Sequence, residues 1–329
     1  MTTRRKLVIA MGAGALAPFA SFSQTPGKVW RVGFLAARHV DFVDADFIYG
    51  PFTQGMRELG FIAGKNLVIE WRSSEGKSER LPELAAELVR LKLDVLVTAG
   101  TPAALAAQKA TTAIPIVMIS VGDLIGSGMI KSLARPGGNS TGLSNMSAEL
   151  GPKLLEMLHD MAPKVTRVAV LVNPSNLTHA ALLKNVQAAA QTLGVKVQTV
   201  EASTPKEIAN GFAAMGRQNA GAFIASLDPF FIQQRKQIVE LAAKQRLPSI
   251  GAFGEYVEAG GLMSYGPNVG EMFRRGATYV DKIFKGANPG NIPVEQPTKF
   301  DLVLNLKTAK AFGIKVPQSV LIQATRGTE

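Results

Sequence analysis

The chain has 329 residues, of which 47% are hydrophobic and 19% are charged, so it is long enough for two folded lobes and too apolar for a disordered protein. Its net charge of +11 would suit a nucleic-acid partner, but the Lys and Arg residues are spread among acidic residues and form no dense basic run. Because the chain contains no cysteine, disulfides, thiolate metal sites, cysteine nucleophiles and a lipid-modified cysteine are all excluded.

The N-terminal segment has the order of regions that is typical of a signal peptide. Arg4, Arg5 and Lys6 precede an apolar run over residues 7–22, and small and polar residues follow. The run is shorter than the roughly 20 apolar residues of a membrane-spanning helix. We therefore expect residues 1–23 to be a signal peptide, with a mature periplasmic chain that starts near Gln24. The adjacent Arg pair also fits a twin-arginine signal, and the alternative to cleavage is a retained membrane anchor.

After residue 28, short apolar runs alternate with segments that have the helical period of 3.6 residues. The apolar runs predict strands at residues 29–35, 67–71, 95–98, 116–120, 168–172, 196–200, 222–225, 249–250, 262–265 and 302–304. The periodic segments predict helices at residues 47–60, 79–91, 102–110, 148–161, 177–193, 205–218, 230–246, 268–286 and 306–312. Continuous apolar strands between amphipathic helices indicate parallel sheets that are covered on both faces.

This alternation occurs twice, which indicates two α/β lobes of similar build. One block covers residues 29–120 and a second covers 167–250, with a Gly-rich segment at 137–142 that we interpret as the connection between the lobes. The predicted fold is α/β, with two similar Rossmann-like lobes that have parallel sheets and are joined by a multi-strand hinge. The N-terminal lobe is expected to hold residues 28–144 plus about 267–297, and the C-terminal lobe residues 145–266 plus about 298–329. The hinge would then cross near residues 143–147, 265–268 and 296–300.

In open α/β sheets, ligands bind beyond the carboxyl ends of the strands. Short polar or Gly-containing loops follow the predicted strands, and two aromatic side chains near them could cover an apolar part of a ligand. The candidate ligand-binding residues on this basis are Phe34, Ala36, Gly100, Thr101, Ala103, Gly122, Asp123, Asn173, Asn176, Asp228 and Phe253.

The segment from Ala99 to Ala104 carries the sharpest of these signals. Thr101 is predicted to be the N-cap of a helix and Pro102 its first residue. The amides of Ala103 and Ala104, the Thr101 hydroxyl and the helix dipole would then offer a site for an anion such as a carboxylate. The alternative is a well-capped helix that binds nothing.

The candidates in the second block also have structural alternatives. Asp228 precedes Pro229 and either caps the helix that follows or meets a ligand ammonium across the cleft. Asn173 and Asn176 either face a ligand or only form a turn and a helix cap. The two aromatic candidates could equally be core residues.

Catalytic signals are weak. The three His residues lack metal-ligand spacing, and the motifs of zinc proteases, serine hydrolases and P-loop proteins do not occur. We therefore expect no enzyme activity, no catalytic residue, no metal and no cofactor.

Several stretches together resemble the ABC transporter substrate-binding protein family that is related to tryptophan/tyrosine-binding components. They are residues 31–35, 98–104, 135–142, 173–176, 260–266 and 305–310, and in order they span nearly the whole mature chain. The resemblance implies a type I periplasmic-binding-protein fold, in which two lobes close on a small solute. It also implies delivery of the solute to an ABC transporter permease with its ATPase, with membrane contact only through the permease. The spread of the basic residues, and not the resemblance, predicts that there is no nucleic-acid partner.

The resemblance does not identify the solute. Asp228-Pro229-Phe230 stands where the aromatic-amino-acid branch has Asp-Asn-Thr, so only Asp228 carries over. The function expected from the sequence is extracytoplasmic binding of a small carboxylate-bearing solute, for which an amino acid is one candidate. An exported sensor of the same fold that feeds a membrane signalling protein is the alternative.

Overall fold

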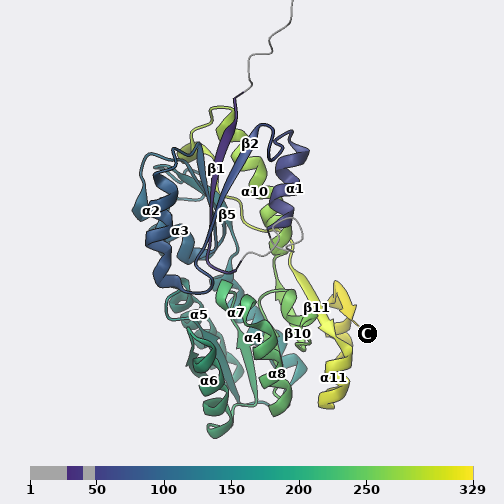
Figure 1. The fold of residues 1–329 in the computed structure, drawn as a ribbon. Coiled ribbons are helices and arrows are strands. Elements are labelled where there is room, and N and C mark those ends of the chain that lie inside the picture. Colours follow the sequence, from purple (N-terminus) through teal and green to yellow (C-terminus); the bar gives the residue numbers. More distant parts are fainter. Residues whose placement is uncertain (1–27, 40–48, 329) are drawn as a thin grey trace, which may run out of the picture.

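The computed structural model describes residues 28–39 and 49–328, and these residues form two α/β lobes stacked end to end (Figure 1). The predicted signal peptide lies outside the described residues. The α/β class and the two sheets, both dominated by parallel strands, confirm the predicted fold class. Within the described chain, no helix is both long and apolar enough to cross a membrane.

The N-terminal lobe contains a parallel sheet of five strands in the order β2-β1-β3-β4-β5. The strands are β1 (Trp30–Ala36), β2 (Leu67–Ser73), β3 (Val95–Ala99), β4 (Ile116–Val121) and β5 (Ser140–Ser144). Alternate residues of β1 point to opposite faces, so Phe34 packs with α1 (Gly50–Glu58) and α10 (Val269–Phe284), whereas Leu35 packs with α2 (Leu81–Val89) and α3 (Thr101–Ala110).

The C-terminal lobe contains a sheet of seven strands in the order β12-β11-β10-β9-β8-β6-β7. The strands are β6 (Arg167–Val172), β7 (Lys196–Glu201), β8 (Ala222–Ala225), β9 (Ser249–Gly251), β10 (Met263–Gly266), β11 (Asp301–Asn305) and β12 (Arg326–Thr328). All neighbouring pairs are parallel except β10 and β11. The helices of this lobe are α4 (Ser147–Met161), α5 (Thr178–Leu193), α6 (Pro205–Arg217), α7 (Pro229–Gln233), α8 (Arg235–Gln245), α9 (Glu255–Glu258), α11 (Leu306–Phe312) and α12 (Gln318–Gln323).

The chain passes between the two sheets in three places: between β5 and α4, between β10 and α10, and in the segment that leads from Glu295 to β11. Two of these passages lie side by side, because the amide of Ser144 donates to the carbonyl of Glu295 at 2.8 Å and the amide of Glu295 donates to the carbonyl of Gly142 at 3.1 Å. Two of the three passages are therefore hydrogen-bonded to each other, and bending of the hinge remains a prediction.

Two element predictions were wrong. The Gly-rich segment interpreted as the connection between lobes runs into β5, which is a full member of the first sheet. A Cβ on Gly142 would lie 1.8 Å from the carbonyl oxygen of Met118, so the close approach of β4 explains the glycine. The helix predicted at residues 230–246 is divided at Gln234 into α7 and α8.

Candidate ligand-binding site

The carboxyl ends of strands in the two sheets face each other across the waist of the molecule (Figure 1). From the first lobe come the segments after β1, β3 and β4, and from the second lobe the segments after β6 and β8. Ligands are predicted to bind at this edge of each sheet, so both sheets would contribute to one site between the lobes.

The lobes touch each other along this waist. A Cβ on Gly100 would lie 2.9 Å from Cγ of Pro229, and a Cβ on Gly122 would lie 3.1 Å from Oγ1 of Thr178. The amide of His39 donates to Oε1 of Gln233 at 3.3 Å. These three contacts join opposite lobes, so the structure has the lobes in a closed arrangement.

A small inner cavity of ≈ 30 Å³ remains between the lobes at the strand ends. Residues of both lobes and of α10 line it, namely Arg38, Tyr49, Ala99, Gly100, Thr101, Ser120, Asn145, Asn176, Leu227, Pro229, Ile232, Val269 and Phe273. Small-molecule pockets generally measure about 300–1,000 Å³, so the lobes must separate further before a solute can enter the inner cavity.

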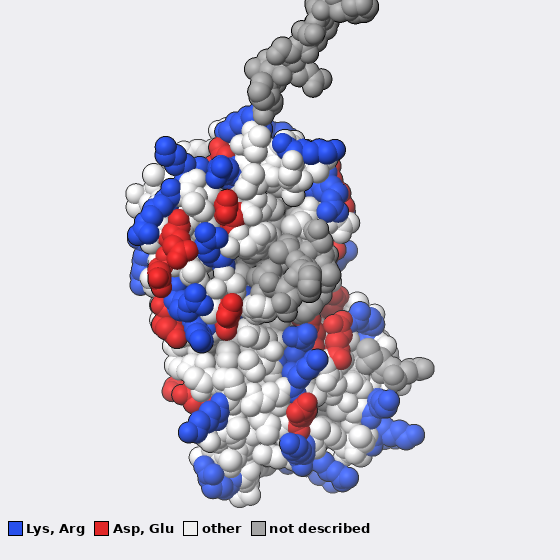
Figure 2. All heavy atoms as spheres, in the orientation of Figure 1, with Lys and Arg blue, Asp and Glu red and all other residues white. Residues whose placement is uncertain are grey.

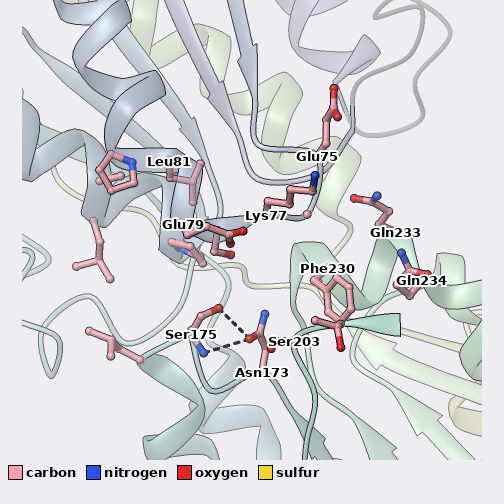
Figure 3. A pocket seen from close by; sticks show the side chains of 18 of the residues that line it. Glu75, Lys77, Glu79, Leu81, Asn173, Ser175, Ser203, Phe230, Gln233 and Gln234 are labelled. Carbon is pink, nitrogen blue, oxygen red and sulfur yellow. Dashed lines mark hydrogen bonds between the residues drawn. The ribbon is translucent and has the colours of Figure 1, made fainter. Parts of the chain in front are cut away.

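A wider outer groove of ≈ 810 Å³ opens beside the inner cavity (Figure 3). The loop from Glu75 to Glu79 and helix α3 border it on one lobe, and Asn173, Ser175, Phe230, Gln233 and Gln234 border it on the other. Thr101 and Pro229 line the inner cavity while their neighbours Pro102 and Phe230 line the outer groove. The groove therefore lies next to the inner cavity, on the side of α3.

The start of α3 differs in detail from the prediction. Gly100 is the N-cap residue, with φ 82° and ψ 167°, and Thr101 is the first helical residue. The amide of Ala104 donates to the carbonyl of Gly100 at 3.1 Å and is not free, which corrects the predicted pair of free amides. Within the described chain, no acceptor faces the amides of Thr101 and Ala103. The Thr101 hydroxyl oxygen accepts from the amide of Gly122 at 3.2 Å, so its hydrogen remains available for a ligand.

The end of β4 supplies a second hydroxyl. Ser120 has φ 58°, and Nδ2 of Asn145 donates to its carbonyl oxygen at 2.9 Å and to its Oγ at 3.3 Å. Oδ1 of Asn145 in turn accepts from the amide of Ser147 at 3.0 Å. Because Ser120 Oγ accepts from the asparagine, its own hydrogen can be donated into the inner cavity.

Arg38 brings positive charge to the same cavity. The residue follows β1 and is buried, and its guanidinium carbon lies 4.4 Å from the centre of the Tyr49 ring. Tyr49 packs edge-on against Phe34 and Phe273, so the cation rests on an aromatic cluster.

On the opposite lobe, Asp228 is fully engaged within its own lobe. Its Oδ1 accepts from Nδ2 of Asn173 at 3.1 Å and from the amide of Phe230 at 2.9 Å, and its Oδ2 accepts from Nδ2 of Asn176 at 2.9 Å. The structure thus supports the helix-capping alternative for Asp228. The carboxylate also fixes the orientation of both asparagines.

His179 completes this polar cluster. The amide of Asn173 donates to its Nδ1 at 2.9 Å, so the proton of the neutral ring is on Nε2, which faces the carbonyl of Leu227 at 3.4 Å. Burial lowers the pKa of the His179 imidazole below its ordinary value, although the nearby charge of Asp228 opposes this effect. The ring thus joins Asn173 to the loop before α7 within the second lobe.

The eleven candidate residues fall into three groups. Gly100, Thr101 and Asn176 line the inner cavity and Asn173 lines the outer groove. The remaining candidates lie at other positions: Phe34, Ala36, Ala103 and Phe253 are buried in the cores, Gly122 packs against the other lobe, Asp228 caps α7, and Asp123 forms a turn with the amide of Gly126.

Sequence reasoning missed most of the cavity wall. Arg38 lies in the loop after the first predicted strand and was among the strand-end residues, but it was not selected as a candidate, and Ser120 is the last residue of another predicted strand. Val269 and Phe273 belong to α10, which returns to the first lobe from the second, and no local pattern marks them as cavity residues.

The described residues hold no group of three or more His, Asp or Glu side chains that could bind a metal ion. Among the described lining residues, the arrangement offers hydroxyl and amide groups, the guanidinium of Arg38 and apolar side chains.

Two α/β lobes whose sheets face each other at their strand ends, and which are joined by three chain passages, define a type I periplasmic-binding-protein fold. The chain belongs to the ABC transporter substrate binding protein family, whose model matches residues 39–327. The resemblance seen in the sequence is thereby confirmed.

Comparisons with individual proteins agree with this assignment. The chain is 24% identical over 265 residues to the tyrosine-binding protein of Clostridioides difficile (strain R20291), with 80% of this chain and 76% of the relative covered. It superposes with a TM-score of 0.83 on the ABC domain from Streptococcus pneumonia in complex with L-Trp, at 26% identity and with 91% of this chain and 99% of that chain covered. The ligand-free, open structure of a substrate binding protein with adhesive properties from Clostridium difficile gives a TM-score of 0.63, at 24% identity and with 92% and 100% covered.

Proposed function

We propose that this protein is the extracytoplasmic solute-binding component of an ABC importer and that it closes its lobes on a small solute with a carboxylate group. The observation that carries the proposal is the inner cavity, which lies at the strand ends of both sheets and is lined by residues of both lobes. A solute held there would contact both lobes at once and so stabilise the closed arrangement.

The start of α3 supports a carboxylate as the recognised group. The amide and the hydroxyl of Thr101 and the positive end of the helix dipole lie at the wall of the cavity. Each such contact contributes on the order of 0.3–2 kcal/mol, and exclusion of water by closure strengthens them. Arg38 adds a positive charge to the same space.

The hinge supports a bind-and-close mechanism. Three backbone passages connect the lobes, and the contacts of Gly100 with Pro229 and of His39 with Gln233 exist only when the lobes are together. The higher similarity to the L-Trp complex than to the ligand-free, open relative also fits a closed arrangement. Separation and closure of the lobes would thus gate the solute.

The proposed location is outside the cytoplasmic membrane, after removal of a signal peptide of about 23 residues. The proposed partners are an ABC permease and its ATPase, which would receive the solute from the closed form. Charged side chains of both signs are mixed over both lobes on the face shown in Figure 2, so no large single-sign patch covers that face.

A thermal-shift screen of the mature protein against amino acids, aromatic acids and small carboxylates tests the proposal. We expect at least one carboxylate to raise the Tm, and small-angle scattering with that compound to give a radius of gyration smaller than that of the protein alone. A tight solute that leaves the radius of gyration unchanged would contradict the closing mechanism. A screen in which only sugars or cations bind would contradict the carboxylate.

A further inference from the structure

The return segment, which comprises residues 289–295, leads the chain from α10 back toward the second lobe and lies against the first lobe. Its backbone groups form hydrogen bonds of 2.8–3.1 Å with the first lobe, and the partners are Leu133, Gly137, Thr141, Gly142, Ser144 and Tyr279. Residues 296–299, which follow, form no turn, cap or side-chain hydrogen bond within the described chain. At Phe300 the chain has reached the second lobe, where the ring stacks on Tyr265 of β10. The attachment to the first lobe therefore ends at Glu295.

Glu295 links all three passages between the lobes. Its amide and its carbonyl bond to Gly142 and Ser144 of β5, the strand that leads into the first passage. Its carboxylate accepts from Nε of Arg275 at 2.9 Å and from Nη2 of Arg275 at 2.6 Å. Arg275 lies on α10, which begins directly after the second passage, and the third passage begins at Glu295 itself. A single residue thus holds the first-lobe ends of the three passages together.

Helix α10 gives this ion pair a firm base in the first lobe. The helix packs against β4 and β5, and it lies so close to α1 that a Cβ on Gly55 would be 2.8 Å from the carbonyl oxygen of Arg274. Because both partners belong to the first-lobe side of the hinge, the Arg275–Glu295 pair does not have to break when the lobes separate. Both side chains are partly exposed, so the pair contributes little to overall stability, but its two parallel hydrogen bonds fix a direction.

We propose that Glu295 and Arg275 are positioning residues for lobe closure, because their ion pair fixes the end of the return segment and confines bending to residues 145–146, 267–268 and 296–299. This inference rests on the proposed function and names the residues that guide its closing motion. Without the pair, the end of the return segment would detach more easily and the open state would spread over more arrangements. Closure from a wider ensemble loses more conformational entropy, so the closed state would be less populated.

Spin labels on the mature protein test the inference in the absence of any ligand. Since the chain has no cysteine, Glu83→Cys on α2 and Lys206→Cys on α6 place one label on the exposed surface of each lobe, beside the outer groove. Double electron–electron resonance then gives the distribution of distances between the labels. We expect Arg275→Gln and Glu295→Gln each to widen this distribution about 1.5-fold or more, toward longer distances. Both variants should also make the amides of the return segment exchange hydrogen about tenfold faster.

Two further variants serve as controls. Arg274→Gln removes the same charge from the neighbouring residue of α10, but the Arg274 guanidinium donates to Oε2 of Glu58 on α1, within the first lobe, at 2.8 Å. This variant should keep the wild-type distribution. Arg275→Lys keeps the charge but cannot make both parallel hydrogen bonds, so its distribution should lie between those of the wild type and Arg275→Gln.

The inference is overturned if both Gln variants keep the wild-type distribution, since the backbone alone would then guide the lobes. It is also overturned if Arg274→Gln widens the distribution as much as Arg275→Gln, because the effect would then belong to α10 as a whole. If Arg275→Gln fails to fold, which its Tm reveals, the comparison of Arg275→Lys with Arg274→Gln decides instead. The proposed function fails separately, if no compound in the thermal-shift screen shortens the distance between the labels in the otherwise wild-type protein.

Discussion

Gly100 at the start of α3 faces Pro229 at the start of α7 so closely that a Cβ on the glycine would lie 2.9 Å from the proline Cγ. The two residues belong to opposite lobes, and both line the inner cavity. Gly100 also has φ 82° with ψ 167°, a backbone conformation that is almost confined to glycine. Closure of the lobes therefore depends on the absence of a side chain at this position.

Gly100→Ala is expected to weaken solute binding at least tenfold, because the added methyl group keeps the lobes apart. Backbone strain should also lower the free energy of unfolding by about 1–3 kcal/mol. Gly64→Ala is the matched control, since Gly64 has φ +79° but nothing within 4 Å of an added Cβ. The Gly64→Ala variant should lose stability but keep its affinity for the solute. Calorimetry and small-angle scattering with the bound compound would show whether only the first variant fails to close.

The stability of the protein is expected to fall as the pH drops below about 6.5, partly through His179. Burial lowers the pKa of this imidazole below its ordinary value of 6.5, so the unfolded chain binds a proton that the folded chain excludes. The stabilisation is fully present above the ordinary pKa and is lost as the pH falls toward the folded value. NMR titration of the three His side chains should give His179 a pKa below 6.5, and a value above 6.5 would contradict this assignment.

Tyr256 and Ser249 form a buried hydrogen-bonded pair, and the stability losses from substituting the two residues should not add up. The phenol donates to Oγ of Ser249 at 2.6 Å and both residues are buried. Burial raises the pKa of the Tyr256 phenol, although the hydrogen bond to Ser249 opposes this effect. Tyr256→Phe leaves a buried hydroxyl unsatisfied and is expected to cost about 1–3 kcal/mol. Adding Ser249→Ala should restore part of this loss, because no polar group is then left without a partner. Chemical unfolding of the two single variants and the double variant measures the coupling, and strict additivity would contradict it.

Export is expected to remove about the first 23 residues, because a basic, an apolar and a small-residue region follow one another in that order. Mass spectrometry of periplasmic protein should show an N-terminus near Gln24. Recovery of the chain with Met1 intact in the membrane fraction would instead indicate a retained anchor. Replacing Arg4 and Arg5 together with Lys should abolish export only if the twin-arginine route is used.

The amino-acid sequence by itself determined the architecture of the two lobes. Apolar runs such as Val95–Ala99 can be buried on both faces only in a covered parallel sheet, and the helical period between them supplies the cover. The same local rules placed Gly100 and Thr101 at the end of a strand, which is where the ligand space lies. The resemblance to the family then added the closing of two lobes, which no local pattern contains.

Only the tertiary structure decided which strand-end residues share a space and which of their polar groups are free. In the sequence, the side chains of Asp228 and Thr101 look equally able to bind a ligand. In the folded chain, the Asp228 carboxylate accepts three hydrogen bonds from its own lobe, whereas the Thr101 hydroxyl accepts one and keeps its hydrogen for donation. Phe273 became part of the cavity because α10 returns to the first lobe after a long excursion of the chain. Hydrogen-bond availability and long-range packing depend on partners distant in sequence, and only the folded chain brings those partners together.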